Sequence, residues 1–168
     1  MIVVAYGANL PSKAGDPVQT YHEALSVIEE AGLSIVCKSS LWETSPVGTP
    51  DEQPWYVNAV MQVETDLRPQ ALMEFLLSVE AEFGRVRTFK NAAKCIDLDL
   101  ICYNDEVITQ GEELIVPHPR MGGRAFVLLP MQEIISDWTH PVSGQTLSDL
   151  IDVLPADQEA RIIQDQAA

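Results

Sequence analysis

Residues 55–64 read WYVNAVMQVE, and their side chains alternate between two sets. One set is apolar and comprises Val57, Ala59, Met61 and Val63; the other comprises Tyr56, Asn58, Val60 and Gln62. Because successive side chains of a strand point to opposite faces, this alternation predicts a β-strand over the whole stretch. It also predicts that the aromatic ring of Tyr56 and the amide of Asn58 share one face.

Helices are predicted on both sides of this strand. Residues 17–31 carry apolar side chains at helical spacing, with Asp16 as the N-cap and Gly32 as the stop. Residues 69–82 form a second apolar stripe, which Gly84 ends. The rest of the pattern predicts strands at 2–6, 33–44 and 96–103, helices at 123–135 and 146–153, loops at 45–54 and 85–95 (the second of them mobile), and a frayed tail after Pro155.

The resulting order, β-α-β-β-α-β with extra helices at the C-terminus, predicts the fold class. It is typical of an α+β protein in which helices pack on a ferredoxin-like antiparallel sheet. A chain of 168 residues with 46% hydrophobic residues is large enough to bury its own core. We therefore expect a single domain over residues 1–168.

Composition excludes several classes of protein. Ten Lys and Arg against 25 Asp and Glu give a net charge of −15, so we expect no nucleic-acid partner. Three widely spaced cysteines predict neither a disulfide framework nor a zinc site and favour a reducing compartment. No apolar run approaches the roughly 18 residues of a membrane helix, so we expect a cytoplasmic protein with no membrane partner. Neither a P-loop sequence nor a dinucleotide glycine pattern occurs.

The sharpest chemical signal is the stretch Ile-Asp-Leu-Asp-Leu at residues 96–100. Asp97 and Asp99 are two positions apart on a predicted strand, so they project from one face with Cα atoms about 6.6–7 Å apart. Two converging carboxylates repel each other unless a cation lies between them, and hard oxygen ligands suit Mg²⁺. The alternative is a strand with one solvated face, which an isolated pair of this kind more often indicates.

Basic residues are concentrated around this pair. Residues 85–124 hold six bases and six acids, whereas the rest of the chain has four bases against nineteen acids. Cations beside a metal site would neutralise a polyphosphate. The alternative is a solvated loop with unrelated charges. The six bases are Arg85, Arg87, Lys90, Lys94, Arg120 and Arg124.

A second group of residues suits a flat polar ring. Tyr56 and Phe126 offer aromatic faces, Asn58 offers an amide, and residues 46–48 offer the backbone of a tight loop. The alternative is that both aromatic residues belong to the core. Two further residues stay open at this point: Glu80 is either a contact near nucleotide or metal or an exposed helix acid, and His118 either meets a phosphate or caps a loop.

Taken together, these segments resemble the 6-hydroxymethyl-7,8-dihydropterin pyrophosphokinase family of folate biosynthesis. The matching segments follow one another in order along nearly the whole chain. They are residues 7–10 (GANL), 44–48 (TSPVG), 56–59 (YVNA), 84–87 (GRVR), 96–100 (IDLDL), 116–121 (VPHPRM) and 124–128 (RAFVL).

The resemblance implies an activity and a set of site residues. The family transfers the β,γ-pyrophosphoryl group of ATP to the hydroxymethyl oxygen of the pterin and releases AMP, with two Mg²⁺ ions and with loops that close over both substrates. It implies no partner beyond these two small molecules, and we expect a monomer. Asp97 and Asp99 would hold the metal and act in catalysis with Arg85 and Lys94. The pterin would lie against Thr44, Pro46, Val47, Tyr56, Asn58 and Phe126, and the nucleotide against Glu80, Arg87, Leu100, His118 and Arg124.

One segment departs from the family pattern. An aromatic or basic pair followed by Gly-Pro-Arg-Thr usually precedes the Asp-x-Asp strand, whereas residues 90–95 read KNAAKC. Lys94 therefore replaces an arginine and loses the planar fork that grips phosphate, so we expect weaker or differently aimed phosphate contacts. Phe89 is a candidate for the missing aromatic residue. We also expect the plain pair Gly122-Gly123 to loosen the approach to Arg124.

Three hypotheses follow from the sequence. The first is an active, Mg²⁺-dependent pterin pyrophosphokinase. The second is a degenerate relative that binds pterin or nucleotide with little or no transfer, as the altered residues 90–95 suggest. The third is a ferredoxin-like sensing or interaction module, against which the Asp97/Asp99 pair argues because a sensor has no need of a paired metal site.

Overall fold

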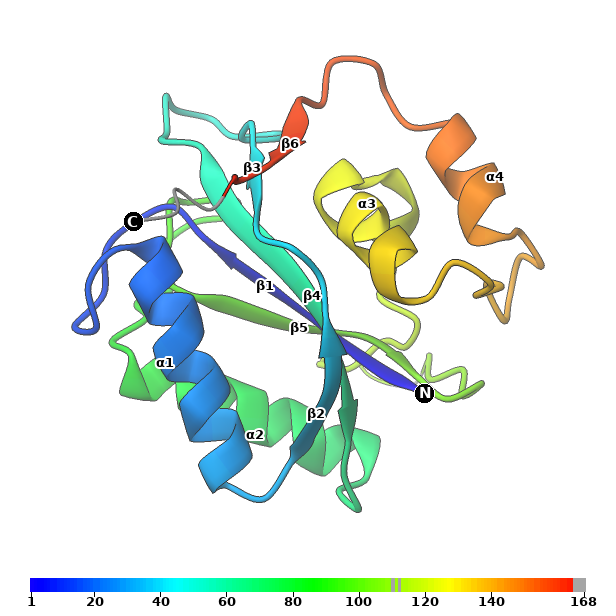
Figure 1. Ribbon diagram of the computed structural model, residues 1–168, viewed down its shortest axis with the longest axis horizontal. Helices are drawn as coiled ribbons and strands as arrows, with labels where there is room; N and C mark the ends of the chain where they lie inside the picture. The colour runs from blue at the N-terminus through cyan, green and yellow to red at the C-terminus, as the bar shows by residue number, and fades with distance from the viewer. Residues whose placement is uncertain (110, 112, 165–168) are drawn as a thin grey trace.

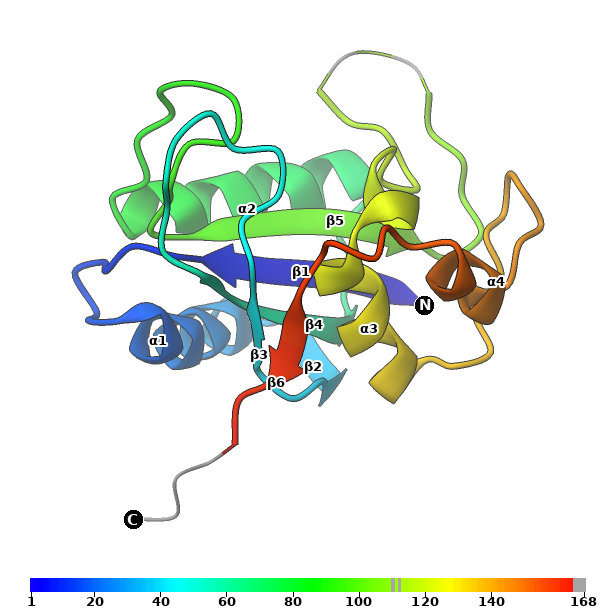
Figure 2. The same ribbon diagram turned by 90° about the horizontal axis from the view of Figure 1, so that it is seen from above.

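The computed structural model describes residues 1–109, 111 and 113–164. Within them the chain forms a six-stranded sheet of antiparallel pairs in the order β5-β1-β4-β3-β6, with β2 also paired to β4 (Figures 1 and 2). The strands are β1 (Ile2–Ala8), β2 (Ser34–Lys38), β3 (Trp42–Thr44), β4 (Tyr56–Glu64), β5 (Asp97–Tyr103) and β6 (Ala160–Ile162). The helices are α1 (Pro17–Glu30), α2 (Pro69–Glu82), the 3₁₀ turn η1 (Met121–Gly123), α3 (Ala125–Ile134) and α4 (Leu147–Asp152).

The predicted α+β class is confirmed, and the predicted order β-α-β-β-α-β is present apart from the additional strand β3. The elements β1-α1-β2-β4-α2-β5 follow the expected sequence, and β3 and β6 extend the sheet on the β4 side. Helix α1 starts where the sequence predicts, because Asp16 and Gln19 form a reciprocal capping box, and the chain leaves the helix at Gly32 with φ +96°. The predicted bounds of α2 are confirmed.

The sheet separates two apolar cores. Helices α1 and α2 cover one face and α3 and α4 the other (Figure 1). Along β4, Ala59 and Met61 face α1 and α2, whereas Val60 faces α3, as period-two alternation requires. Leu128 and Met131 of α3 are completely buried on this second side.

Two predictions about the strands are wrong. The stretch 33–44 is not one strand, because β2 pairs with the far end of β4 and β3 pairs with its start. Between them Ser39 bonds the backbone of Val60 with both its amide and its hydroxyl, which bends the chain. The predicted fraying after Pro155 does not hold for residues 160–162, which form β6 and add to the open edge of β3; the last part of that tail, residues 165–168, lies outside the described residues.

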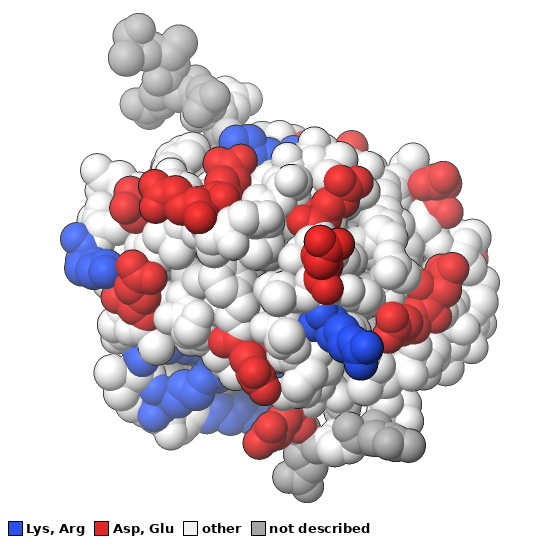
Figure 3. Space-filling view, turned by 90° about the horizontal axis from the view of Figure 1, so that it is seen from below, with Lys and Arg blue, Asp and Glu red and all other residues white. Residues whose placement is uncertain are grey.

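The charges are distributed unevenly. The view from below in Figure 3 shows acidic side chains spread over the surface, and fewer basic side chains, some of which lie together at the lower left. None of the helices in the described ranges is long and apolar enough to cross a bilayer.

Candidate active site

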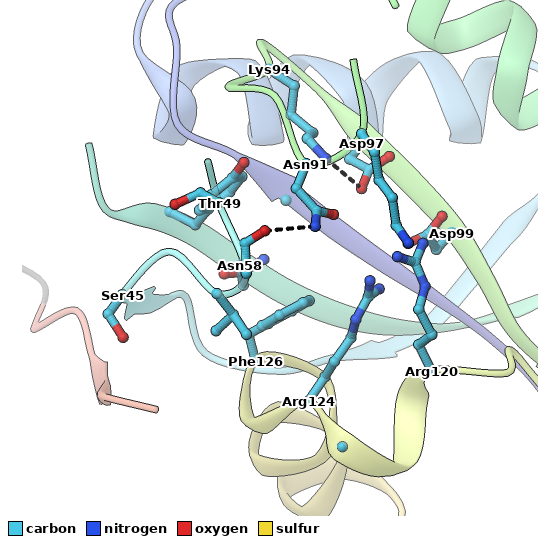
Figure 4. A pocket seen from close by; sticks show the side chains of 16 residues that line it. Ser45, Thr49, Asn58, Asn91, Lys94, Asp97, Asp99, Arg120, Arg124 and Phe126 are labelled. Carbon is cyan, nitrogen blue, oxygen red and sulfur yellow. Dashed lines mark hydrogen bonds and ion pairs between the residues drawn. The ribbon is translucent and has the colours of Figure 1, made fainter. Parts of the chain in front are cut away.

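A cavity of about 500 Å³ lies on the α3 side of the sheet, beyond the N-terminal end of that helix (Figure 4). Its floor is the sheet, and its walls are two loops and the start of α3. From the sheet come Gly7, Tyr56, Asn58, Asp97 and Asp99; from the loops and α3 come Ser45, Val47, Gly48, Thr49, Lys90, Asn91, Lys94, Arg120, Gly123, Arg124 and Phe126.

The register of the strands brings together the polar side chains on the floor of the cavity. Gly7 of β1 pairs with Asn58 of β4 on one side and with Asp97 of β5 on the other. Glycine is required here because a Cβ atom at position 7 would lie 2.7 Å from the Asn58 amide nitrogen. Asn58 and Asp97, on the two strands that flank Gly7, therefore lie at one level of the sheet.

The Asn58 amide is held in a fixed orientation. Its Oδ1 accepts a hydrogen bond from the Thr44 hydroxyl at 2.6 Å, and its Nδ2 donates to the carbonyl of Tyr6 at 3.2 Å. One amide hydrogen and one oxygen lone pair remain for a ligand. Thr44 itself is buried and does not line the cavity, so its place in the site is behind Asn58.

The two aspartates share the floor but differ in their partners. Asp97 Oδ1 bonds Arg85 at 2.5 Å, and its Oδ2 lies 3.8 Å from Lys94 Nζ. Burial opposes ionisation of Asp97, but Lys94 and Arg85 hold its pKa below the ordinary value. Asp99 Oδ2 lies 3.9 Å from the His118 ring nitrogen. Burial together with the charge of Asp97 raises the pKa of Asp99 to about 7, although Arg124 and Lys94 act in the opposite direction.

Glu80 lies behind the aspartates, and the interpretation of it as an exposed helix acid is wrong. Its carboxylate is buried and accepts hydrogen bonds from Arg85, from Arg87 and from the backbone amide of Leu98. Burial raises the pKa of Glu80. The network fixes Arg85 against Asp97, and Glu80 does not line the cavity.

The remaining wall is basic and aromatic. The Arg124 guanidinium lies 5.2 Å from the Phe126 ring centre, and Lys94 Nζ lies 5.9 Å from that of Tyr56. Burial and the neighbouring Arg120 lower the pKa of Arg124. His118 is not among the residues that line the cavity; burial, Arg124 and Arg120 lower its pKa to about 4, so this ring is neutral at pH 7. The cavity wall therefore carries positive charge, which would favour an anionic ligand.

The two predicted loops meet above the cavity. Asn91 donates its side-chain amide to the carbonyl of Gly48 at 2.8 Å, and Gln53 donates to the carbonyl of Asn91 at 2.9 Å. Asn91 has φ +60°, a conformation that asparagine tolerates better than most residues. Sequence reasoning missed Asn91, and this tolerance of the left-handed region is the signal that was available.

Some predicted site residues lie away from the cavity. The Leu100 side chain belongs to the core under α1 and α2, and Pro46 is not among the lining residues. Arg85 and Arg87 line a neighbouring cavity of about 290 Å³ together with Phe89, which therefore does not enter the main site. Lys90, Asn91, Lys94 and Arg120 line both cavities.

The expected loosening around Gly122-Gly123 stays a prediction, but the pair has defined contacts. Residues 121–123 form the 3₁₀ turn η1, and Gln158 bonds the carbonyl of Gly123 at 2.8 Å. The approach to Arg124 is therefore tied to a distant part of the chain.

The donor set fits a hard cation that shares its ligands with a substrate. Among the described residues no group of three or more His, Cys, Asp and Glu side chains gathers as a metal site. Asp97 and Asp99 alone would leave most positions around Mg²⁺ to phosphate oxygens and water, which is how proteins often hold this ion with nucleotides.

The chain is an α+β protein with an antiparallel sheet, and its cavity combines paired carboxylates and cations with an aromatic and amide wall. Such a site is suited to a small ligand that has a ring and an anionic part. A family model described as 7,8-dihydro-6-hydroxymethylpterin-pyrophosphokinase (HPPK) matches residues 3–136. The chain belongs to this family, as predicted from its motifs.

Two relatives show the same likeness over most of their lengths. The 2-amino-4-hydroxy-6-hydroxymethyldihydropteridine pyrophosphokinase of Haemophilus influenzae is 40% identical over 88% of this chain and 89% of its own. The protein of the same name from Synechocystis is 37% identical over 89% of this chain and 74% of its own.

Longer proteins also match. The folic acid synthesis protein fol1 of Pneumocystis carinii is 35% identical over 88% of this chain, which spans only 19% of that protein. A crystal structure titled HPPK-DHPS in complex with substrates aligns over 90% of this chain with a TM-score of 0.67. The identity is 15% and the chain spans 42% of that structure, so this likeness supports the fold alone.

Proposed function

We propose that this chain is an active pyrophosphokinase. It transfers the β,γ-pyrophosphoryl group of ATP to the hydroxymethyl oxygen of 6-hydroxymethyl-7,8-dihydropterin and releases AMP. The observation that carries this proposal is that one cavity contains both the carboxylate pair, Asp97 and Asp99, and the ring-binding group Tyr56, Asn58 and Phe126. Family membership supports the same reading.

The pterin ring would lie between aromatic faces and be recognised by fixed polar atoms. Tyr56 comes from the floor and Phe126 from the start of α3. Asn58 keeps one donor and one acceptor free, which matches the amide-like edge of a pterin. Because Thr44 and Tyr6 already hold this amide, recognition requires little reorganisation.

The carboxylate pair and the cations would hold the polyphosphate. Asp97 and Asp99 would bind Mg²⁺, two ions in the fullest form of the proposal, and bound Mg²⁺ would neutralise charge on the phosphate oxygens. Lys94, Arg120 and Arg124 project into the same cavity from other segments and supply further positive charge. Neutral His118 can donate one ring N–H to a phosphate oxygen.

In the proposed reaction the hydroxymethyl oxygen forms a bond to the β-phosphorus of ATP. The bond from that phosphorus to the oxygen shared with the α-phosphorus breaks, AMP leaves with the electron pair, and the hydroxyl proton passes to solvent. Positioning and charge neutralisation supply most of the catalysis in such transfers. Residues of the cavity would therefore act mainly by orienting the two substrates.

Lys94 is the proposed phosphate-binding residue that differs from the family pattern, so its substitution is where we expect activity to differ. It keeps a positive charge near Asp97 but offers no two-pronged contact to phosphate. We propose that Arg120, which has no ion-pair partner among the described residues, supplies part of that grip.

The proposal includes a setting for the reaction. We place it in the cytoplasm, where the three free cysteines suit reducing conditions. One domain over residues 1–168, acting as a monomer on two small molecules, would suffice.

The decisive experiment measures AMP release from ATP, Mg²⁺ and 6-hydroxymethyl-7,8-dihydropterin, with a control that omits the pterin. We expect AMP only when all three are present, and chelation of the metal should stop its release. If ATP binds in the presence of Mg²⁺ but no pterin-dependent AMP forms, the chain is a binding relative and the proposal is wrong.

A further inference from the structure

The segment after α4 returns to the cavity and crosses the start of α3 before it adds to the sheet as β6 (Figure 2). Residues 158–163 of this segment are called here the C-terminal strap. The strap lies outside residues 3–136, which the family model matches. It contacts both walls of the cavity through successive residues.

Gln158 holds the α3 wall. Its side-chain oxygen accepts a hydrogen bond from the Ala125 amide at 2.8 Å, and its side-chain nitrogen donates to the Gly123 carbonyl at 2.8 Å. These two contacts lie on either side of Arg124. The N-cap of α3 is Arg124, which makes no side-chain capping bond, so Gln158 supplies the cap from a distant part of the chain.

Glu159 holds the opposite wall through its backbone. Its carbonyl accepts a hydrogen bond from the Ser45 amide at 2.9 Å, and its amide donates to the Ser45 hydroxyl at 3.1 Å. Ser45 begins the loop that brings Val47 and Gly48 to the cavity. Two adjacent residues of the strap therefore set the separation of the two walls.

The strap is anchored at its outer end as well. Arg161 bonds the Glu43 carboxylate at 2.8 Å, and its guanidinium lies 5.1 Å from the ring centre of Trp55. The Ile163 amide donates to the Leu41 carbonyl at 2.8 Å. These contacts join the strap to both chain segments that flank the loop at residues 45–54.

We propose that the C-terminal strap sets the geometry of the pterin subsite and that Gln158 is its positioning residue. Gln158 does not line the cavity; it acts by fixing where α3 starts and therefore where Phe126 and Arg124 project. The inference rests on the proposed function only in taking the ligand of this subsite to be the pterin.

The test compares two substitutions at one position with a control on the same segment. Gln158→Ala removes both contacts. Gln158→Glu keeps an acceptor for the Ala125 amide but loses the donor to Gly123. Gln164→Ala changes an exposed glutamine just after the strap and serves as the control.

Pterin affinity is measured by fluorescence titration in the presence of Mg²⁺ and an ATP analogue with a methylene bridge between the α- and β-phosphorus atoms. Two lost hydrogen bonds should weaken pterin binding about tenfold in Gln158→Ala, with a smaller loss in Gln158→Glu. In steady-state assays the KM for pterin should rise by the same factor, with less change in the KM for ATP. Gln164→Ala should match the unmodified chain.

Hydrogen exchange at the Ala125 amide tests the contact without any substrate. Exchange should accelerate in Gln158→Ala and stay slow in Gln158→Glu. If Gln158→Ala does not fold, Gln158→Glu and Arg161→Ala carry the affinity measurement, and each should still weaken pterin binding.

Unchanged pterin affinity in folded Gln158 variants would overturn the proposal and leave the strap a stabilising element only. A loss of thermal stability with unchanged KM values would have the same meaning. If the unmodified chain binds no pterin, the proposed function fails, whereas slow exchange at Ala125 in Gln158→Ala would refute the capping contact on its own.

Discussion

One face of the sheet has two halves that differ in what covers them. Under α3 and α4, Val3, Val60 and Ile101 are buried in an apolar core. Asn58 and Asp99 lie two positions from Val60 and Ile101 on the same strands, and they face the cavity. The first half stabilises the fold by excluding water, and the second keeps like charges together in a space open to ligands. The alternation of side chains along a strand therefore sets the face to which each side chain points. Whether that side chain is part of the core or of the site depends on whether a helix or the cavity covers it.

In the half that faces the cavity, loss of a carboxylate should leave the fold intact but abolish most of the activity. Replacing Asp97 or Asp99 by Ala should lower pyrophosphoryl transfer by roughly three orders of magnitude or more, because metal and phosphate charge would lose their anchor. The assay is pterin-dependent AMP release, and circular dichroism should show an intact fold. Asp105→Ala, an exposed aspartate beyond the end of β5, is the control. Retained transfer in either site variant would remove these residues from the metal site.

The packed half should behave in the opposite way. Met131→Ala empties a fully buried position on α3 and should lower the free energy of unfolding by about 2–5 kcal/mol. The measurement is urea denaturation, with Leu77→Ala on the exposed side of α2 as the control. Activity measured well below the melting temperature should stay near that of the unmodified chain. A large loss of activity in the folded variant would mean that the two halves are mechanically coupled.

The free energy of unfolding without metal should reveal the repulsion between the carboxylates of Asp97 and Asp99. Folded Asp99 has a pKa of about 7, against 3.8 as its ordinary value, so its neutral form favours folding. That contribution is complete below about pH 4 and is lost as the pH rises through 7. In a metal chelator at pH 8, Asp99→Asn should therefore stabilise the protein by about 2 kcal/mol, and the gain should vanish near pH 4.

Thermal melts across pH check this effect. Mg²⁺ with ATP should stabilise the unmodified chain and leave Asp99→Asn nearly unchanged. If Asp99→Asn melts at a lower temperature than the unmodified chain at pH 8, the carboxylate pair is not a site of repulsion.

The smallest effect should come from the altered loop. Lys94→Arg restores a two-pronged contact and should keep activity or raise it by about two- to fivefold, mainly through the KM for ATP. Lys38→Arg on β2 is exposed and serves as the matched control. A large loss in Lys94→Arg would show that the ammonium contact with Asp97 and Tyr56 needs the compact lysine head.

Most of the fold was predictable because its signals are local. The capping of α1 by Asp16 and the stop at Gly84 depend on a few neighbouring residues, and both are confirmed. The division of residues 33–44 into two strands and the addition of β6 were not predictable in this way. Both depend on pairing with strands far along the chain.

The candidate site likewise has residues that local patterns predicted and residues that they did not. Asp97, Asp99, Tyr56 and Asn58 were identified from alternation and motif, and all four lie on the cavity floor. The burial of Glu80 beneath Arg85 was not predictable, because a charged residue on a helix is usually exposed. The capping role of Gln158 gave no sequence signal either, since its partners lie 33 and 35 residues away.

The sequence by itself determined most of the strands and helices, which side chains share a face, and to which family the chain belongs. These properties follow from backbone periodicity and from short motifs, which are encoded over a few residues. Only the tertiary structure decided how Lys94, Arg120 and Phe126 converge on the cavity that contains the aspartates, and how the strap joins the two walls. Such contacts depend on register and on the packing of distant segments, which no local pattern specifies.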